Sequence, residues 1–308
     1  MPKISVIGAG NVGATLAQRL IEKDFADVVM LDVVEGIPQG KALDISQSAN
    51  ILGFSHTITG SNDYAETAGS EIVVITAGIA RKPGMTREEL LAINQKIMTD
   101  VVSNCLKYSP EATLVVVSNP VDTMTYLAWK LSGLPRKRVV GLSGVLDGGR
   151  LATFVARELG VKPSAVTPCV MGEHGGSMVV MPRFTLVSGK PLSELVSAEK
   201  ADELAKRAVN GGAEIVAFLK TGSAFYAPSA SVATMVAAIF TGSGKVMNCA
   251  AVLDGEYGLK NIVLGVPVKL GKGGIQEIIT LPLDKMENAS LLASAEVVKG
   301  QIAALSLK

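Results

Sequence analysis

Short apolar segments alternate with longer amphipathic segments through the first 143 residues, and this alternation restricts the possible folds more than any other feature. After the first apolar run, Val12, Leu16 and Leu20 recur at helical spacing, and residues 86–107 form a second helix-like segment. Strands that are apolar on both faces and alternate with helices predict a parallel sheet covered on both sides. The apolar runs are KISVIG, DVVMLD, SEIVVITAG, ATLVVVSNP and RVVGLS.

A glycine-rich segment, GAGNVG, follows the first run, and Gly8, Gly10 and Gly13 form the pattern G-x-G-x-x-G. Between a strand and a helix, such glycines allow a tight turn and a close approach of the backbone to a diphosphate at the helix N-terminus. Asp32 ends the next strand, 19 residues after Gly13, where a carboxylate accepts hydrogen bonds from ribose hydroxyls and repels a 2′-phosphate. We therefore expect an α/β fold with a Rossmann-type doubly wound parallel sheet that binds NAD in preference to NADP.

Polar and charged residues also follow the later predicted strands of the first half. The segment TAGIARKPGMTREE carries Arg81 and Arg87 on a loop that can close over a ligand, and VSNPVD (117–122) places Asn119 at the end of the next strand. In LSGVLDGGR, Asp147 and Arg150 are three residues apart, which places them on one side of a helix. Because ligands of doubly wound folds bind at the carboxyl ends of the strands, these groups are expected to line a common cleft.

The chain has only two histidines. His174 lies in GEHG at the end of an apolar run, where an imidazole that titrates near neutral pH suits proton transfer. His56 lies in GFSHTITG with no motif around it, so we expect it to be structural.

The pattern changes after residue 143 to paired strands and long helices. We expect a dinucleotide-binding domain over residues 1–143 and an α+β substrate domain over residues 144–308. GKGG (Gly271–Gly274) is expected to be a hairpin turn, and NGG (Asn210–Gly212) a kink or break in a helix. A docked C-terminal helix is expected to bury one face, formed by Leu291, Ala295, Val298, Ile302 and Leu305.

The amino-acid composition limits the classes of partner and cofactor that we expect. Lys and Arg number 29 against 28 Asp and Glu, so no overall charge points to nucleic acid or a membrane surface. Three cysteines far apart argue against a disulfide scaffold or a Cys-rich zinc site and fit a reducing compartment. With no signal-like leader and no apolar run of roughly 18 residues, we expect a cytoplasmic protein without a metal, a nucleic acid or a membrane as partner.

Together, GAGNVG, Asp32, ARKPGMTR, VSNPVD, LDGGR and GEHG resemble the 2-hydroxy-acid dehydrogenases in order and spacing, most closely the lactate-dehydrogenase-like branch of the malate dehydrogenases. The resemblance covers essentially the whole chain. It implies that His174 is the catalytic acid and base, that Asp147 holds its imidazole, and that Arg150 grips the C1 carboxylate of the substrate. It further implies that Arg87 polarises the reacting carbonyl and that Asn119 lies beside substrate and nicotinamide. The implied contacts with NAD are Gly8, Ala9, Gly10, Asn11, Val12, Gly13, Asp32, Asn94, Val117, Ser118 and Asn119.

Arg81 carries the implied specificity. It matches the loop position at which lactate dehydrogenases generally carry an uncharged glutamine and malate dehydrogenases an arginine. Oxaloacetate has a second carboxylate that needs a cation once water leaves, so the resemblance implies reversible oxidation of (S)-malate by hydride transfer to NAD. It also implies a homodimer or homotetramer, between which the sequence does not choose.

Three alternatives stay open. A lactate dehydrogenase is the nearest, and Arg81 argues against it. An NAD-dependent glycosidase on a related fold would need a metal with Cys and His ligands, for which the chain offers no convincing group. A non-catalytic NAD-binding sensor would have no need of His174 together with Asp147 and three arginines, and it would turn over no 2-hydroxy acid.

Overall fold

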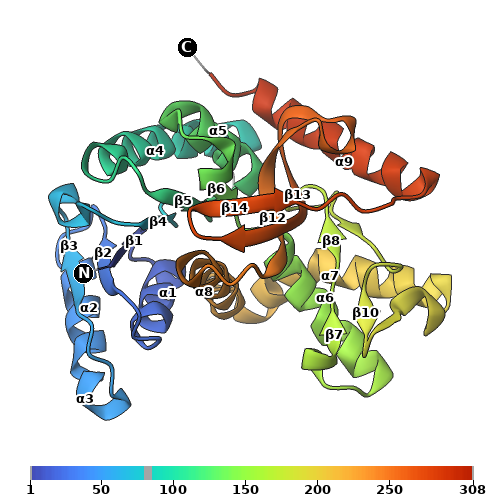
Figure 1. The fold of residues 1–308 in the computed structure, drawn as a ribbon, viewed down its shortest axis with the longest axis horizontal. Coiled ribbons are helices and arrows are strands. Elements are labelled where there is room, and N and C mark those ends of the chain that lie inside the picture. Colours follow the sequence, from blue (N-terminus) through green and yellow to red (C-terminus); the bar gives the residue numbers. More distant parts are fainter. Residues whose placement is uncertain (1, 80–84, 307–308) are drawn as a thin grey trace.

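The computed structural model describes residues 2–79 and 85–306 (Figure 1). Its first half forms a parallel sheet in the strand order β3-β2-β1-β4-β5-β6. The order reverses between β1 and β4, which is where doubly wound folds bind their ligands. The strands are β1 Lys3–Ile7, β2 Asp27–Leu31, β3 Ile58–Ser61, β4 Ile72–Ile75, β5 Thr113–Val116 and β6 Val139–Gly141.

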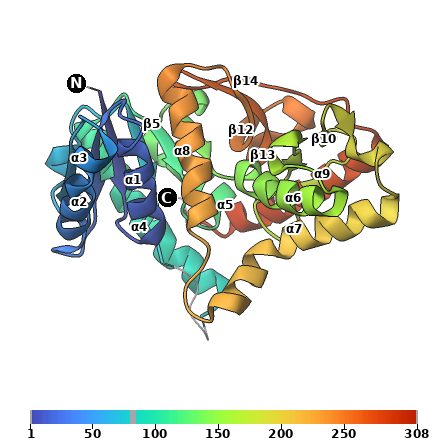
Figure 2. The ribbon, with the colours of Figure 1, turned by 90° about the horizontal axis from the view of Figure 1, so that it is seen from below.

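Helices cover both faces of this sheet, as the sequence predicts (Figures 1 and 2). Along β4, Val74 packs in one apolar core with α1 and α8, whereas Val73 and Ile75 pack in a second core with α4 and α5. Successive strand side chains point to opposite faces, so a fully apolar strand serves both cores. The helices are α1 Asn11–Ile21, α2 Ile37–Gln47, α3 Ala49–Leu52, α4 Arg87–Tyr108, α5 Val121–Ser132 and, from the second half, α8 Tyr226–Thr241.

Three antiparallel strands of the second half continue the same sheet. β12 (Val246–Asp254) pairs with β6, where Ala250 lies opposite Gly141. β13 (Lys260–Gly271) and β14 (Gly274–Ile278) follow as a hairpin, which confirms the predicted turn at residues 271–274. The sequence did not indicate that these strands join the first sheet. Their pairing covers the edge of β6, which would otherwise expose unpaired backbone groups.

The rest of the second half consists of three helices and short strands, in agreement with the predicted α+β pattern. The helices are α6 Gly144–Leu159, α7 Ala198–Leu219 and α9 Lys285–Ala303. The strands are β7 Val166–Thr167, β8 Val170–Met171, β9 Val179–Val180, β10 Leu186–Val187 and β11 Lys190–Pro191. Single 3-10 turns lie at Tyr64–Thr67, Arg136–Arg138, Pro163–Ala165, Leu192–Glu194 and Glu256–Gly258.

Helix α7 corrects one expectation. It runs without interruption through the NGG segment, so a break at Asn210–Gly212, one of the two predicted possibilities, is wrong, and a kink there stays a prediction. The glycines have a packing reason instead: a Cβ at Gly211 or Gly212 would lie 3.2 Å from the side chain of Arg150. The predicted face of α9 is confirmed at Leu291, Ala295 and Val298, whose exposed fractions are 0%. Within the described residues, no helix has both the length and the apolar character to cross a membrane.

Candidate functional site

The glycine-rich loop joins β1 to α1 at the carboxyl end of the sheet. Gly8 has a φ of +107°, which favours glycine, and a Cβ at Gly13 would overlap the carbonyl oxygen of Gly8. Gly10, the residue that precedes α1, faces open space. The loop is therefore tight on its inner side and open on its outer side, which fits a diphosphate at the positive end of a helix. The loop and first turn contain all six predicted residues, Gly8, Ala9, Gly10, Asn11, Val12 and Gly13.

Asp32 lies directly after β2 and faces this loop. Its Oδ2 accepts a hydrogen bond of 2.6 Å from the backbone N–H of Ala9, and its Oδ1 accepts one of 3.0 Å from Val34. The carboxylate thus lies beside the glycine-rich loop, and its contact with ribose stays a prediction.

Asn94 of α4 ties together two loops at the carboxyl edge. Its Oδ1 accepts from the Ile79 N–H at 2.9 Å, and its Nδ2 donates to the carbonyls of Ile79 (3.2 Å) and Asn119 (2.8 Å). The side chain is buried, and its amide hydrogen-bonds the loop after β4 to the loop after β5. Ser118 adds a hydrogen bond to the carbonyl of Ala77. These bonds fix the segment 117–119, and contact of Asn94 with a dinucleotide stays a prediction.

His174 and Asp147 form the central pair of the site. His174 follows β8, and Asp147 lies in the first turn of α6. The imidazole Nδ1 lies 2.7 Å from Asp147 Oδ2, and the two side chains are 13% and 1% exposed. With Nδ1 bonded to the carboxylate, the other ring nitrogen, Nε2, is left for a ligand. A carboxylate in this position orients the ring and stabilises its protonated form.

The surroundings of His174 shift its pKa in opposing directions. Burial lowers the pKa, while the charge of Asp147, its hydrogen bond and the charge of Asp122 raise it. The raising effects prevail, so the pKa lies above the ordinary value for histidine. The imidazole consequently holds its proton to a higher pH than a free side chain.

Arg150 lies one turn after Asp147 on α6. Its Nη1 donates to Asp147 Oδ1 at 3.0 Å, so both oxygens of that carboxylate are bonded, one to each partner. Its Nε is buried and has no hydrogen-bond partner within the described residues. A buried, charged donor without a partner is destabilising, and an anionic ligand would supply the missing acceptor.

Asp122, in the first turn of α5, is a residue to which the sequence assigned no role. Its Oδ2 accepts a 2.7 Å hydrogen bond from the backbone N–H of His174. Burial raises the pKa of Asp122 to about 7, although the bond from His174 opposes this shift. The aspartate stands in VSNPVD, but the pattern does not indicate that it contacts a residue 52 positions away.

Glu173 connects the His174 loop to the C-terminal helix. Its Oε1 accepts from Gln301 Nε2 at 2.7 Å, and Gln301 Oε1 accepts from Thr123 Oγ at 2.9 Å. The Glu173 backbone N–H donates to Ser294 Oγ at 2.8 Å. Two consecutive residues of α5 therefore position this loop. Asp122 bonds directly to His174, whereas Thr123 is connected to Glu173 through the side chain of Gln301 on α9.

A cavity of about 720 Å³ opens in front of His174. It is lined by Asn119 and His174 together with residues from the start of α4 and the end of α9. Arg81, predicted to bind the second carboxylate, lies outside the described residues. Arg87 is the first residue of α4, and only its backbone is described.

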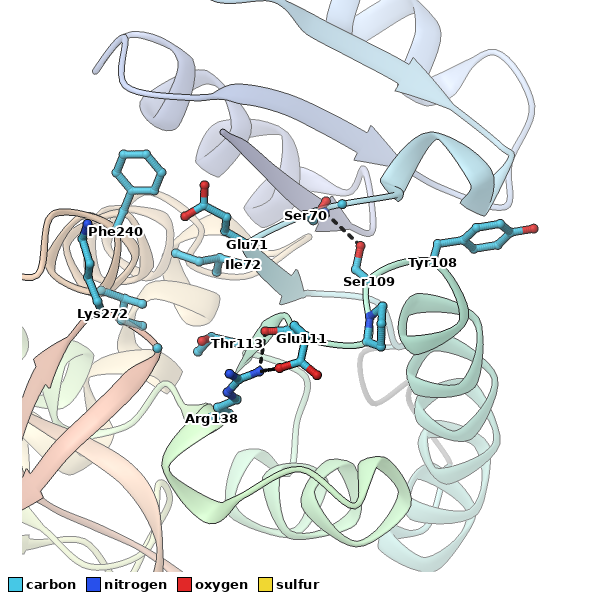
Figure 3. Close-up of a pocket in the computed structure, with 14 residues that line it drawn as sticks. Ser70, Glu71, Ile72, Tyr108, Ser109, Glu111, Thr113, Arg138, Phe240 and Lys272 are labelled. Carbon is cyan, nitrogen blue, oxygen red and sulfur yellow. Dashed lines mark hydrogen bonds and ion pairs between the residues drawn. The ribbon is translucent and has the colours of Figure 1, made fainter. Parts of the chain in front are cut away.

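A different pocket, of about 340 Å³, lies at the amino-terminal edge of β4 and β5 (Figure 3). Its Arg138 is already paired, since Nη1 donates to Glu111 Oε2 at 2.6 Å (Figure 3). Within the described residues its lining includes none of the predicted site residues. Over the same residues, His, Cys, Asp and Glu form no group of three placed to hold a metal ion.

Comparisons with known proteins agree over the full length. The NAD-binding domain model of the lactate/malate dehydrogenases matches residues 2–141, and their alpha/beta C-terminal domain model matches residues 144–306. The malate dehydrogenase of Dehalococcoides mccartyi is 97% identical over 307 residues, 100% of each chain. The solved malate dehydrogenase of Salinibacter ruber is 45% identical with a TM-score of 0.94, covering 98% of this chain and 97% of its own.

A lactate dehydrogenase has the same fold. The Cryptosporidium parvum enzyme, solved with lactic acid and nicotinamide adenine dinucleotide, is 38% identical with a TM-score of 0.95, covering 100% of this chain and 98% of its own. The fold therefore does not separate the two activities. Both family models and the full-length relatives lead to one assignment: the chain belongs to the lactate/malate dehydrogenase family.

Proposed function

We propose that the chain is an NAD-dependent malate dehydrogenase, which interconverts (S)-malate and oxaloacetate. The observation that carries the proposal is the juxtaposition of His174, Asp147 and Arg150: a proton carrier, its orienting carboxylate and an anion-binding guanidinium in contact. The name of the Dehalococcoides relative, malate dehydrogenase, supports the same activity.

Residues 1–143 are proposed to bind the dinucleotide and residues 144–308 to complete the substrate site, in line with the spans of the two family models. The Gly8–Gly13 loop would hold the diphosphate, and Asp32 the adenosine ribose. Because the Asp32 carboxylate would repel a 2′-phosphate, we propose NAD as the preferred cofactor. Bound NAD would supply the hydride acceptor for the oxidation of malate at C2, and bound NADH the hydride donor for the reverse reaction.

His174 is proposed to move the proton. During malate oxidation its neutral Nε2 takes the proton of the 2-hydroxyl group, and the carboxylate of Asp147 stabilises the imidazolium that forms. In the reverse direction the protonated ring donates to the carbonyl oxygen of oxaloacetate. The raised pKa of His174 favours the protonated ring that this direction needs.

Three arginines are proposed to hold the substrate. Arg150 pairs with the C1 carboxylate through the two parallel hydrogen bonds that a guanidinium offers, and its partnerless Nε supports this role. Arg87 polarises the reacting oxygen, and Asn119, which lines the same cavity as His174, contacts the substrate. Arg81 pairs with the second carboxylate, the group that distinguishes oxaloacetate from pyruvate.

The test measures initial rates of NADH oxidation with oxaloacetate and with pyruvate, for the wild type, Arg81→Gln and the neighbouring control Lys82→Gln. A buried charge without its partner costs about 3–5 kcal/mol, or roughly two to four decades in rate. We expect a strong preference for oxaloacetate that collapses in Arg81→Gln and persists in Lys82→Gln. A preference for pyruvate would favour a lactate dehydrogenase, and no rate with either substrate would favour a dinucleotide sensor.

We also propose a homodimer or homotetramer, because α2 and α3 expose apolar side chains such as Leu43 (61%) and Ile51 (80%). Light scattering on the purified protein would give the mass, and a monomer would contradict this.

A cytoplasmic location is proposed because the three cysteines are free and buried, which fits a reducing compartment. Cell fractionation would test it.

A further inference from the structure

We propose that Lys41 is a positioning residue of the dinucleotide site, which fixes the Ala9 peptide of the glycine loop and adds a positive charge beside the diphosphate. The inference rests on the proposed use of a dinucleotide. Lys41 is half-buried on α2, outside the glycine motif, and its Nζ donates a 2.7 Å hydrogen bond to the carbonyl oxygen of Ala9.

Ala9 is held from two sides. Its N–H donates to Asp32 at 2.6 Å, and its carbonyl accepts from Lys41 at 2.7 Å. In a trans peptide the C=O and the following N–H point in opposite directions. By fixing the Ala9 carbonyl, Lys41 therefore fixes the orientation of the peptide between Ala9 and Gly10, directly before α1. A Cβ at Gly10 would meet no atom within 4 Å, so the loop is open at this position.

The helix that carries Lys41 is itself anchored to the ribose side of the site. Gln39 Nε2 donates to Asn62 Oδ1 at 2.5 Å, and Asn62 Nδ2 donates to the backbone carbonyl of Asp32 at 2.7 Å. A Cβ at Gly60 of β3 would overlap the carbonyl oxygen of Pro38, so glycine there allows α2 to lie close to the sheet. The positions of Lys41 and Asp32 are thus connected through α2 and Asn62.

Among the residues that the structure describes, no carboxylate pairs with the ammonium of Lys41. Within residues 2–79 and 85–306, no ion pair includes Lys41. An ammonium has three N–H donors, and the bond to Ala9 uses one. A half-buried, unneutralised cation beside the start of a helix favours an anionic ligand, and a dinucleotide brings two phosphates to this loop.

The test compares the wild type with Lys41→Met, which keeps length but removes charge and donors, and with Lys41→Arg, which keeps both. Lys23→Met, at an exposed lysine, is the control. Dissociation constants for NADH, ADP and adenosine are measured by calorimetry, and kcat and KM with malate are measured separately.

We expect Lys41→Met to raise the Kd for NADH and ADP and the KM for NAD roughly tenfold, the effect of one charged hydrogen bond. Binding of adenosine, kcat at saturating NAD and the melting temperature should stay near wild-type values. Lys41→Arg should restore most of the affinity, and Lys23→Met should change nothing.

Other outcomes overturn the inference in distinguishable ways. An unchanged Kd for NADH in Lys41→Met, or an equal loss for ADP and adenosine, would refute the role of Lys41 alone. A loss of kcat and melting temperature together, without a selective loss of NADH affinity, would assign Lys41 a merely structural role. A wild type that binds no NADH would refute the proposed function and this inference with it.

Discussion

The backbone N–H of His174 donates to the buried carboxylate of Asp122 at 2.7 Å, so one side chain links the first turn of α5 to the loop that carries the imidazole. Asn119 lies three residues before Asp122 and lines the same cavity as His174. The hydrogen bond therefore connects the segments that carry the proposed proton carrier and the proposed substrate contact.

The first prediction concerns Asp122→Asn, which keeps an acceptor for the His174 N–H but removes the charge. Since the Asp122 charge contributes to the raised pKa of His174, its loss should lower that pKa. Malate oxidation needs the neutral ring, so its acid limb should move to lower pH. Oxaloacetate reduction needs the protonated ring, so its alkaline limb should also move to lower pH. Full pH profiles of kcat/KM in both directions measure this, and limbs that stay in place would contradict it.

The second prediction concerns stability. Burial raises the pKa of Asp122 to about 7, so between about pH 4 and pH 7 the folded protein binds more protons at this site than the unfolded chain does. The contribution of this group to the free energy of unfolding is therefore present at low pH and lost as the pH rises towards 7. Asp122→Asn lacks this loss, so its melting temperature minus that of the wild type should increase from pH 4.5 to pH 7.5. Calorimetry at several pH values tests this, and a constant difference would refute the shift.

The third prediction tests whether substrate binding needs the guanidinium of Arg150 or only its positive charge. Arg150→Lys keeps the charge but loses the planar fork, so the KM for malate should rise roughly a hundredfold, the effect of one or two strong hydrogen bonds. The Kd for NADH should stay within about threefold, because the contacts of Arg150 are with Asp147 and with Gly211 and Gly212 of α7. Arg207→Lys, on a surface arginine that pairs with Glu214, is the matched control. Equal kinetics in both variants would remove Arg150 from the substrate site.

The fourth prediction concerns the α9 link. Gln301→Leu breaks both hydrogen bonds of Gln301, to Glu173 and from Thr123, without changing any charge. We expect kcat to fall about fivefold, equivalent to one neutral hydrogen bond, with the pH limbs unmoved. Gln301→Glu should place a carboxylate against Glu173 and lower kcat further. A shift of the pH limbs in Gln301→Leu would show that the link does more than position the loop.

The parts that the sequence predicts are those that local pattern determines. The strands around the glycine loop are fully apolar, and Gly8, Gly13 and Asp32 follow a fixed spacing, so their arrangement is predictable. The pairing of His174 with Asp147 was expected only through the family resemblance, because 27 residues and several turns separate them.

The contacts that the sequence does not indicate join distant segments. Glu173 and Gln301 are 128 residues apart, and Lys41 and Ala9 are 32 apart, so no local period connects them. Helix α2 contains Pro38 and Gly40 and buries only Pro38 and Ala42, so its sequence lacks a clear apolar face. Conversely, the NGG segment resembles a helix break because glycine disfavours helices, whereas the close approach of Arg150 explains the glycines.

The pairing of β6 with β12 has a mechanical consequence. Enzymes that close by a hinge rotate one domain against the other about a flexible connection. Here a single sheet runs from β3 through β6 into β14, and such a rotation would have to break the backbone pairing of Ala250 with Gly141. The continuous sheet therefore opposes a hinge rotation between its two halves, and we expect rearrangement on ligand binding in the loops and helix ends at its carboxyl edge.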